Sequence, residues 1–194
     1  MKLLIVADSH GRDLQGIIKR LEPDWDILVI WLGQKTSLLR QYYDGRLSEI
    51  LAYNPDTIIL HSGHNDVAFH VRYNREPIGI VELFPEVMDF REYLQANHPR
   101  ASIYLSSLFP RTESGNFNIE QTGIYNRMAK RYMETVRSAA NSGNFGRLLN
   151  RVLWKSVKKC IEIPEYFDRG GLHLNATGKE SICAAWIADL SGVH

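Results

Sequence analysis

The side chains best suited to chemistry stand in three short polar segments that lie far apart in the chain. Ser9 follows the apolar run LLIVA, Asn65 stands in the segment SGHND, and His173 stands in the segment GLHLN. A serine hydroxyl becomes a good nucleophile only when a nearby base takes its proton, and imidazole titrates near neutral pH. The oxyanion formed by attack on a carbonyl needs fixed N–H donors. His173 is therefore the candidate base, and the candidate donors are the Asn65 amide and the backbone N–H groups of Ser9 and Gly33.

Taken one at a time, these residues have simpler explanations. A serine after a strand is more often a turn or N-cap residue, and an Asn-Asp pair such as Asn65-Asp66 competes well for backbone groups in loops. The neighbouring Asp8 is best explained as a structural residue that accepts hydrogen bonds from loop amides. His10 and His64 flank the site, and we assign them no role. The chemical interpretation depends on whether the three segments meet.

The elements that must position these segments alternate along the whole chain. Four apolar runs, at residues 2–7, 25–31, 57–62 and 101–107, lack strict alternation, which is typical of strands buried on both faces. Amphipathic segments predict helices at 14–21, 39–51, 80–96, 121–140 and 179–190, the last with Asn175 or Thr177 as its N-cap. Residues 146–163 fit either a strand or a helix. This alternation predicts a three-layer α/β/α sandwich around a central parallel sheet of four to five strands.

The predicted fold brings the candidate residues to one place. Ligands of open parallel sheets bind outside the carboxyl ends of the strands. Ser9 follows the first predicted strand, Gly33 the second and Asn65 the third, and His173 precedes the last helix. We therefore expect all four to converge on one rim, where glycine at position 33 lets the backbone approach a ligand closely.

These segments together resemble a known enzyme family. ADSH at 7–10, Gly33, GHND at 63–66 and GLHLN at 171–175 are similar, in order and placement, to the motif blocks of the SGNH hydrolases, also called GDSL esterases. The resemblance implies a flavodoxin-like α/β/α fold and serine-dependent hydrolysis of acetyl, longer acyl or lipid esters, without metal or cofactor. It also implies that Ser9, Gly33 and Asn65 form the oxyanion hole and that His173 is the base. Ala7 replaces the usual glycine, a small-for-small change.

The acidic member of the site departs from the family pattern. The family places it three residues before the histidine, where this chain has Gly170, and the nearest carboxylate before His173 is Asp168. The flexible pair Gly170-Gly171 could let the loop bulge so that Asp168 reaches the imidazole as the third catalytic residue. Alternatively, a backbone carbonyl or a water molecule orients the ring and leaves a Ser–His dyad.

The length indicates a single domain over residues 1–194, which the resemblance implies is an SGNH hydrolase domain, either a whole protein or a domain cut from a longer chain. With 44% hydrophobic and 23% charged residues, the composition is that of a globular protein with a substantial core. Cys160 and Cys183 lack metal-ligand spacing and fit a reducing compartment. The first apolar run is too short for a signal peptide. We therefore expect an intracellular location, cytoplasmic or nuclear.

Positive charge is concentrated in one stretch. Residues 127–159 hold nine Lys or Arg and one acid, Glu134, so this stretch carries +8 and the rest of the chain −7, which sum to the net +1. The stretch is either a solvated helical face or a docking surface for anionic phospholipid or RNA, with Lys155, Lys158 and Lys159 as candidate contacts. No base-reading motif accompanies it, so we expect no sequence-specific nucleic-acid binding. This basic region and the last motif also resemble the esterase domain in first-open-reading-frame proteins of some non-LTR retrotransposons.

The sequence allows two alternatives to an esterase. One is a catalytically weak module of the same fold that binds anionic membranes or RNA through the basic stretch, an interpretation kept open by the displaced acid. The other is a nucleotide-binding flavodoxin-like protein. The loop DSHGR after the first predicted strand has one glycine and an acid, and it lacks a glycine-rich phosphate cradle. Nucleotide binding is therefore the weaker alternative.

Overall fold

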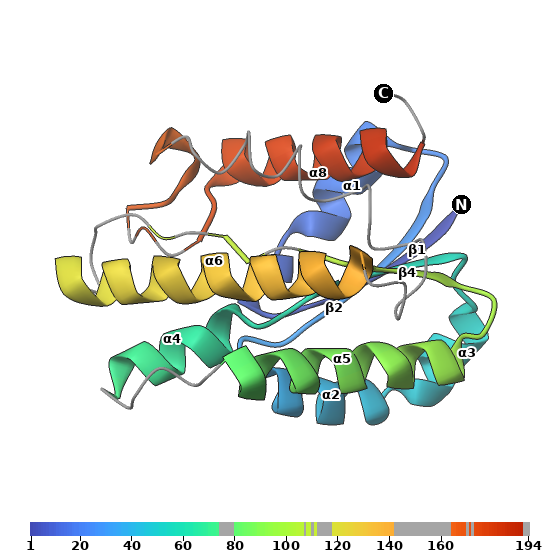
Figure 1. Cartoon of the computed structure of the whole chain (residues 1–194). Helices are drawn as coiled ribbons and strands as arrows, with labels where there is room; N and C mark the ends of the chain where they lie inside the picture. The colour runs from blue at the N-terminus through green and yellow to red at the C-terminus, as the bar shows by residue number, and fades with distance from the viewer. Residues whose placement is uncertain are drawn as a thin grey trace.

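The computed structural model describes residues 1–73, 80–106, 108–109, 111, 118–141, 164–169, 171 and 173–191. Its centre is a parallel sheet of four strands in the order β2-β1-β3-β4 (Figure 1). The strands are β1 (Lys2–Ala7), β2 (Asp26–Trp31), β3 (Thr57–His61) and β4 (Ser102–Leu105). The predicted α/β fold with a parallel central sheet is confirmed. The first and last residues of each strand lie within two residues of the predicted bounds.

Helices cover both faces of the sheet, which gives three layers (Figure 1). One face carries α1 (Leu14–Leu21) and α8 (Ala176–Leu190), which pack against each other. The other face carries the remaining α-helices of the described chain: α2 (Thr36–Asp44), α3 (Leu47–Tyr53), α4 (His64–Arg72), α5 (Ile80–Asn97) and α6 (Ile119–Asn141). Within the described residues, no helix has the length and apolar character needed to cross a bilayer.

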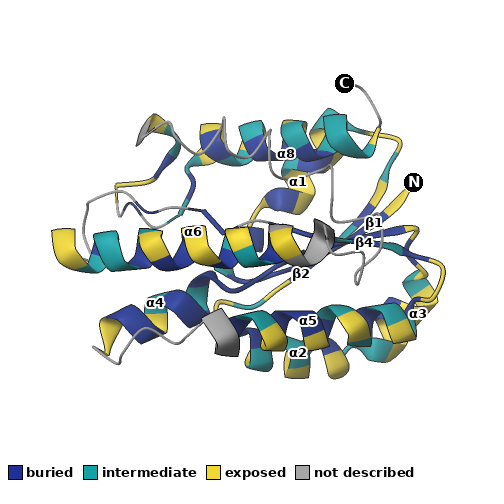
Figure 2. Ribbon diagram, viewed as in Figure 1, coloured by how far each residue is buried: buried dark blue, intermediate teal, exposed yellow. Residues whose placement is uncertain are grey.

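Burial of both faces explains why the two inner strands, β1 and β3, are continuous apolar runs. In β1, Leu3 and Ile5 pack with α1 and α8, whereas Leu4 and Val6 pack with the helices of the opposite layer. All four side chains are essentially inaccessible. In Figure 2 the exposed residues of the helices lie mainly on their outer faces, and the buried ones lie toward the sheet. Each such side chain stabilises the fold by roughly 1.5–3 kcal/mol relative to an exposed one.

Three helical segments differ from the sequence-based expectations. The predicted helix over 39–51 is two helices, α2 and α3, which are separated by Gly45 and Arg46. Helix α4 was not predicted. The last helix begins at Ala176, three residues earlier than expected, and the Asn175 side chain caps it by accepting a hydrogen bond of 2.9 Å from the Gly178 N–H. Residues 146–163 lie outside the described residues.

Candidate active site

Ser9 and His173, separated by 164 residues in sequence, meet at the carboxyl end of the sheet. Ser9 begins a short 3-10 helix, η1 (Ser9–Gly11), immediately after β1 and Asp8. His173 lies between the 3-10 helix η3 (Pro164–Tyr166) and α8. Its Nε2 is 2.9 Å from the Ser9 Oγ, and both residues are half-buried. The serine hydroxyl can therefore donate its proton to Nε2, which is the geometry of a nucleophile beside its base.

The sharp turn from β1 into η1 is built by Asp8 and Gly11. Asp8 caps η1 by accepting a hydrogen bond from the His10 N–H (3.1 Å), and its carbonyl accepts one from the Gly11 N–H (3.0 Å). A Cβ on Gly11 would lie 2.6 Å from the Ala7 Cβ and 2.8 Å from the Trp31 Cβ. Glycine therefore lets η1 rest directly on the ends of β1 and β2, and this contact places Ser9 at the rim.

A narrow loop presents His173. Phe167 and Leu174 form an antiparallel bridge, and the Asp168 N–H donates to the His173 carbonyl at 2.8 Å. This pairing sets Asp168 opposite His173 across the loop. The Asp168 Oδ2 lies 3.8 Å from the His173 Nδ1, which is within ion-pair range but too long for a hydrogen bond. The acid five residues before the histidine is thus brought to the correct side of the imidazole.

The protonation state of His173 suits a base. Burial lowers the pKa of His173, the nearby His10 lowers it further, and Asp168 opposes both effects. The ring of His10 lies beside it, with 5.0 Å between the ring centroids. A lowered pKa keeps the imidazole neutral at physiological pH, so that Nε2 has a lone pair for the Ser9 proton.

Gly33 lies beside Ser9, and Asn65 is bonded to the same loop, whereas their role as oxyanion donors stays a prediction. A Cβ built on Gly33 would be 3.7 Å from the Ser9 Cβ, so the loop after β2 runs alongside the serine. The Asn65 amide donates a hydrogen bond of 3.1 Å to the Gln34 carbonyl, which joins the start of α4 to that loop. An amide has two N–H groups, and this bond uses one of them. The turn into α4 requires φ = 115° at Gly63, a value that favours glycine.

Comparison with known proteins identifies the fold. No protein-family model and no curated protein matches the sequence. A candidate SGNH hydrolase from Slackia heliotrinireducens has a TM-score of 0.69 at 12% identity over 98% of both chains. A candidate GDSL-like lipase from Parabacteroides merdae has a TM-score of 0.64 at 14% identity, covering 98% of this chain and 95% of that one. An acetyl xylan esterase matches with a TM-score of 0.64 at 17% identity over 100% of both chains. The chain has the SGNH hydrolase fold.

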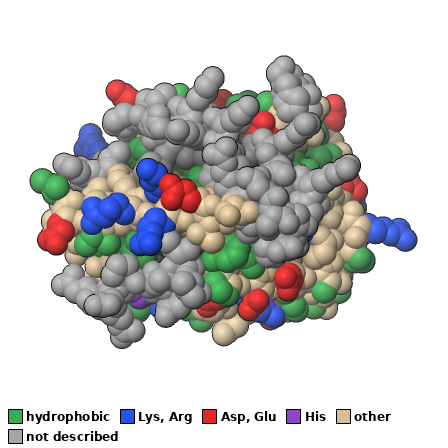
Figure 3. All heavy atoms as spheres, viewed as in Figure 1, with side chains coloured by type: hydrophobic (Ala, Val, Ile, Leu, Met, Phe, Trp, Pro, Cys, Tyr) green, Lys and Arg blue, Asp and Glu red, His purple; other side chains and the backbone are tan. Residues whose placement is uncertain are grey.

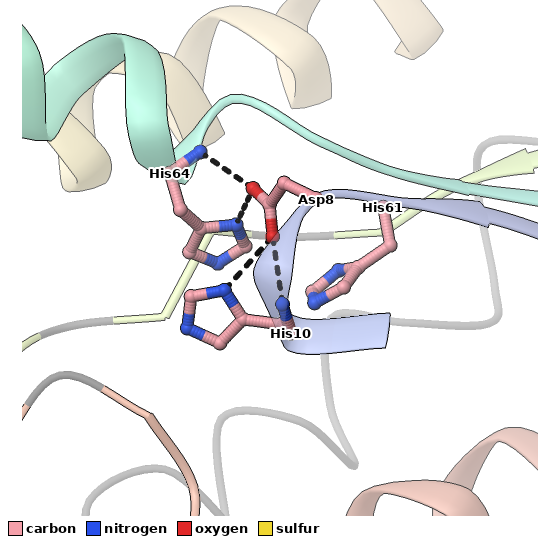
Figure 4. A group of neighbouring side chains, drawn as sticks. All are labelled: Asp8, His10, His61 and His64. Carbon is pink, nitrogen blue, oxygen red and sulfur yellow. Dashed lines mark hydrogen bonds and ion pairs between the residues drawn. The ribbon is translucent and has the colours of Figure 1, made fainter. Parts of the chain in front are cut away.

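In this SGNH fold, the aspartate of the first motif is a buried hydrogen-bond hub beneath the rim that carries Ser9. The Asp8 carboxylate accepts hydrogen bonds from the backbone N–H and the Nδ1 of His10, at 3.1 and 2.9 Å. It also accepts hydrogen bonds from the backbone N–H and the Nδ1 of His64, at 3.1 and 2.9 Å (Figure 4). The expected structural role of Asp8 is confirmed, and it extends to the next motif because His64 directly precedes Asn65.

Hydrogen bonding defines the tautomer of His64. The Phe109 N–H donates to the His64 Nε2 at 3.0 Å, so the ring proton must be on Nδ1, where it faces Asp8. Burial, with His10, lowers the pKa of His64 to about 4. Burial alone would raise the pKa of Asp8, but the charges and hydrogen bonds of His64 and His10 outweigh burial and hold that pKa well below its usual range. At neutral pH the hub is therefore a carboxylate that accepts a hydrogen bond from the neutral imidazole of His64.

Among the described residues, the same cluster is the candidate metal site. Asp8, His10, His61 and His64 are buried, and each offers one ligand atom within 4.8 Å of the others (Figure 4). Three imidazoles and a carboxylate are suitable zinc ligands. However, a metal at the Nδ1 of His64 would replace the proton that Asp8 accepts and would force the other ring proton against the Phe109 N–H. The donor types fit a zinc ion, whereas the hydrogen bonds of this structure do not.

Asp66, the last residue of the third motif, connects two helices. Its carboxylate accepts hydrogen bonds from the Thr36 N–H at 3.1 Å and the Thr36 hydroxyl at 2.9 Å. Burial raises the pKa of Asp66 to about 6, against the opposing hydrogen bonds from Thr36. Asp66 therefore joins α2 to α4 below the Asn65 side chain.

A cleft of about 460 Å³ opens beside Gly33 and Asn65. Its lining comes from the loop after β2, the start of α2, one face of α4 and the segment after β4: Gly33, Gln34, Lys35, Leu38, Asn65, Ala68, Phe69, Arg72 and Arg111. The outer residues of this cleft, which lie on α4, were not predicted from the sequence. Asn65, Ala68, Phe69 and Arg72 follow the i, i+3, i+4, i+7 spacing of one helix face, and this spacing could have revealed them.

Proposed function

We propose that the protein is a serine esterase that hydrolyses carboxylic esters. The observation that carries this proposal is the 2.9 Å contact between the Ser9 Oγ and the His173 Nε2 at the carboxyl rim of the sheet. Gly33 and Asn65 lie on the same rim. Solved structures of the same fold that bear the names acetyl xylan esterase and lipase support an ester as the substrate class.

The reaction proceeds in two half-reactions. Ser9 Oγ attacks the ester carbonyl while its proton passes to the His173 Nε2, and the carbonyl π electrons move onto the oxygen. The Ser9 and Gly33 N–H groups and the Asn65 amide stabilise this oxyanion, each donor lowering the barrier by roughly 3 kcal/mol. The carbonyl re-forms, the bond to the alcohol breaks, and His173 protonates the leaving alcohol. Water then attacks the acyl-serine with His173 again as base, which releases the acid and restores Ser9.

Asp168 acts as the third member of this site. Its carboxylate lies on the Nδ1 side of His173, where it stabilises the imidazolium that forms during each proton transfer. A shortening of the 3.8 Å separation to hydrogen-bond length requires only a small movement of an exposed side chain. The reaction needs no redox group or metal, because proton transfer and hydrogen bonding supply each step.

The test compares hydrolysis of p-nitrophenyl esters of increasing acyl length by the wild type and by Ser9→Ala. Acetyl, longer acyl and lipid esters remain the proposed substrates, and this series ranks them by kcat/KM. Ser48→Ala is the matched control because Ser48 is an exposed serine on α3. Wild-type turnover with loss in Ser9→Ala alone supports the proposal. A Ser9→Ala protein that hydrolyses p-nitrophenyl acetate at the wild-type rate would refute it.

The exposed face of α6 supports a second proposal, docking on an anionic phospholipid surface. Lys and Arg side chains gather over α6 in Figure 3. Arg127, Lys130 and Arg131 are exposed on this helix, which also carries the exposed acids Glu120 and Glu134. Lys155, Lys158 and Lys159 lie outside the described residues, so their part in this surface is a prediction from sequence alone. The resemblance to retrotransposon esterase domains and the intracellular location also stay predictions. Each basic residue near an anionic membrane contributes about 1 kcal/mol.

Liposome sedimentation tests the docking surface. The wild type should bind vesicles that contain phosphatidylserine and not neutral phosphatidylcholine vesicles, and about 0.5 M salt should release it. Changing Arg127, Lys130 and Arg131 together to Glu should abolish binding, whereas p-nitrophenyl acetate hydrolysis should be unaffected. Equal binding to both vesicle types, or binding to RNA but not to either vesicle, would contradict membrane docking.

A further inference from the structure

The cleft beside Ser9 collects positive charge from three separate segments. Lys35 precedes α2, Arg72 ends α4, and Arg111 follows β4, and all three line the cleft. No acidic side chain is among its lining residues in the described part of the chain. Leu38, Ala68 and Phe69 form much of the remaining wall. The cleft is thus apolar and cationic, and it begins at the oxyanion residues.

The charge of Lys35 is held over the cleft by an aromatic ring. The Lys35 Nζ lies 3.4 Å from the centroid of the Phe69 ring, which comes from the neighbouring helix α4. A cation over an aromatic face is attracted by the ring quadrupole. This contact holds the ammonium group of Lys35 at the wall of the cleft, which both residues line.

Arg111 is anchored from the opposite wall. Its backbone N–H donates to the Asn126 Oδ1 at 2.7 Å, and its carbonyl accepts from the Asn126 Nδ2 at 3.0 Å. Its guanidinium lies 4.3 Å from the Tyr125 ring centroid. Burial lowers the pKa of Arg111, and the charge of Arg72 adds to this effect, whereas Tyr125 and Asp8 oppose it. An anion in the cleft would lower the cost of keeping this buried cation charged.

The acid next to Asn65 does not neutralise the cleft. Asp66 is buried and accepts hydrogen bonds from the backbone and the hydroxyl of Thr36, so its carboxylate belongs to the junction of α2 and α4. The charged side chains among the described lining residues of the cleft are therefore Lys35, Arg72 and Arg111.

We propose that this cleft binds an anionic group, a carboxylate or a phosphate, carried by the ester substrate at some distance from its carbonyl. This inference rests on the proposed function and narrows its substrate class. The oxyanion residues Gly33 and Asn65 fix where the reacting carbonyl lies, and the same cleft continues from them to the cations. The apolar wall accommodates the chain between the carbonyl and the anion. The substrate is thus an amphiphilic ester with one negative end.

Paired esters test the proposal and locate the anion. On the acyl side, mono-p-nitrophenyl adipate and suberate are compared with p-nitrophenyl hexanoate and octanoate. On the alcohol side, 4-carboxyphenyl acetate and 4-acetoxyphenyl phosphate are compared with 4-carbamoylphenyl acetate. We expect the anionic member of one arm to have at least about tenfold higher kcat/KM, chiefly through a lower KM, because charge-assisted hydrogen bonds are the strong ones. Equal or better turnover of the neutral ester in both arms would overturn the proposal.

Variants that each remove one positive charge from the cleft test whether Lys35 and Arg72 bind the anion. Lys35→Gln and Arg72→Gln should each reduce the ratio of anionic to neutral kcat/KM by about threefold or more, because one cation of a partly exposed cleft is lost. Arg20→Gln is the matched control, since Arg20 is an exposed arginine on α1 in the opposite layer, where it pairs with Glu180. Raised salt should lower the wild-type ratio as well. A ratio that is unchanged in both cleft variants would contradict the assignment.

Binding without turnover separates this proposal from the esterase proposal. Calorimetric titration of Ser9→Ala with mono-p-nitrophenyl adipate, p-nitrophenyl hexanoate and 4-acetoxyphenyl phosphate measures the affinity of the protein for each ester. This measurement can be made even if the wild type hydrolyses none of them. Absent hydrolysis with tighter anion binding would reject the esterase alone. Equal affinity for charged and neutral esters would reject the anion site whatever the enzyme activity is.

Discussion

At the scale of single residues, Ser9 and His173 act as one unit in the proposed chemistry. His173→Ala should lower kcat/KM for p-nitrophenyl acetate by about a thousandfold or more, because the hydroxyl loses its base. The double variant Ser9→Ala/His173→Ala should be no worse than either single variant by more than a few-fold. Steady-state kinetics check this, with a thermal melt to show that the variants fold. Additive losses would mean that the two side chains act independently.

Asn65 tests the oxyanion hole. Asn65→Ala should lower kcat roughly a hundredfold with little change in KM, because its amide is needed mainly when negative charge forms on the oxygen. The same change removes the hydrogen bond to the Gln34 carbonyl, so the melting temperature must be measured alongside the kinetics. Asn97→Ala, at an amide that bonds to the Tyr93 carbonyl away from the site, is the control. A raised KM with normal kcat would assign Asn65 to substrate binding instead.

Asp168 can form a hydrogen bond to His173 only if its carboxylate moves closer than the 3.8 Å seen in the structure. If its carboxylate stabilises the His173 imidazolium from 3.8 Å or closer, Asp168→Asn should lower kcat at least about tenfold. The exposed Asp24, changed to Asn, controls for loss of a surface charge. Retention of more than half the activity in Asp168→Asn would assign the orientation of His173 to a backbone group.

At the scale of elements, the seat of η1 on the sheet depends on Gly11. Gly11→Ala should destabilise the protein by about 1–3 kcal/mol, because its Cβ would overlap the Ala7 and Trp31 side chains and displace η1. Gly16→Ala on α1 is the matched control: no atom lies within 4 Å of its added Cβ, and alanine should stabilise the helix by about 0.5–1 kcal/mol. Urea denaturation measures both. Equal stability of the two variants would show that η1 accommodates a side chain.

The elements also show what the sequence could and could not predict. Buried strands leave continuous apolar runs, so the ends of β1 and β3, and with them the places of Ser9 and Asn65, were predictable. Helix α4 was missed because GHND reads as a loop motif and conceals a helix start that depends on φ at Gly63. The separation of Asp168 and His173 was unpredictable from spacing, since it is set by the bridge between Phe167 and Leu174.

At the scale of the whole molecule, the fold brings Asp8, His10, His61 and His64 together from two neighbouring strand ends. If the cluster works through hydrogen bonds, dialysis against EDTA should leave both p-nitrophenyl acetate turnover and the melting temperature unchanged. Elemental analysis of the purified protein should show less than one zinc per ten chains as an order-of-magnitude bound. A loss of activity on chelation that zinc restores would assign a resident metal to this cluster.

The hub at Asp8 has a consequence for how the rim opens. The backbone N–H groups of His10 and His64 donate to one carboxylate, and the Phe109 N–H donates to the imidazole bound to it. These amides belong to three turns that are distant in sequence, yet none can be released without disturbing the shared charge. In deuterated water, loop amides usually exchange early. These three should instead exchange slowly and at a common rate, so that the turns beneath the serine open as a single cooperative unit.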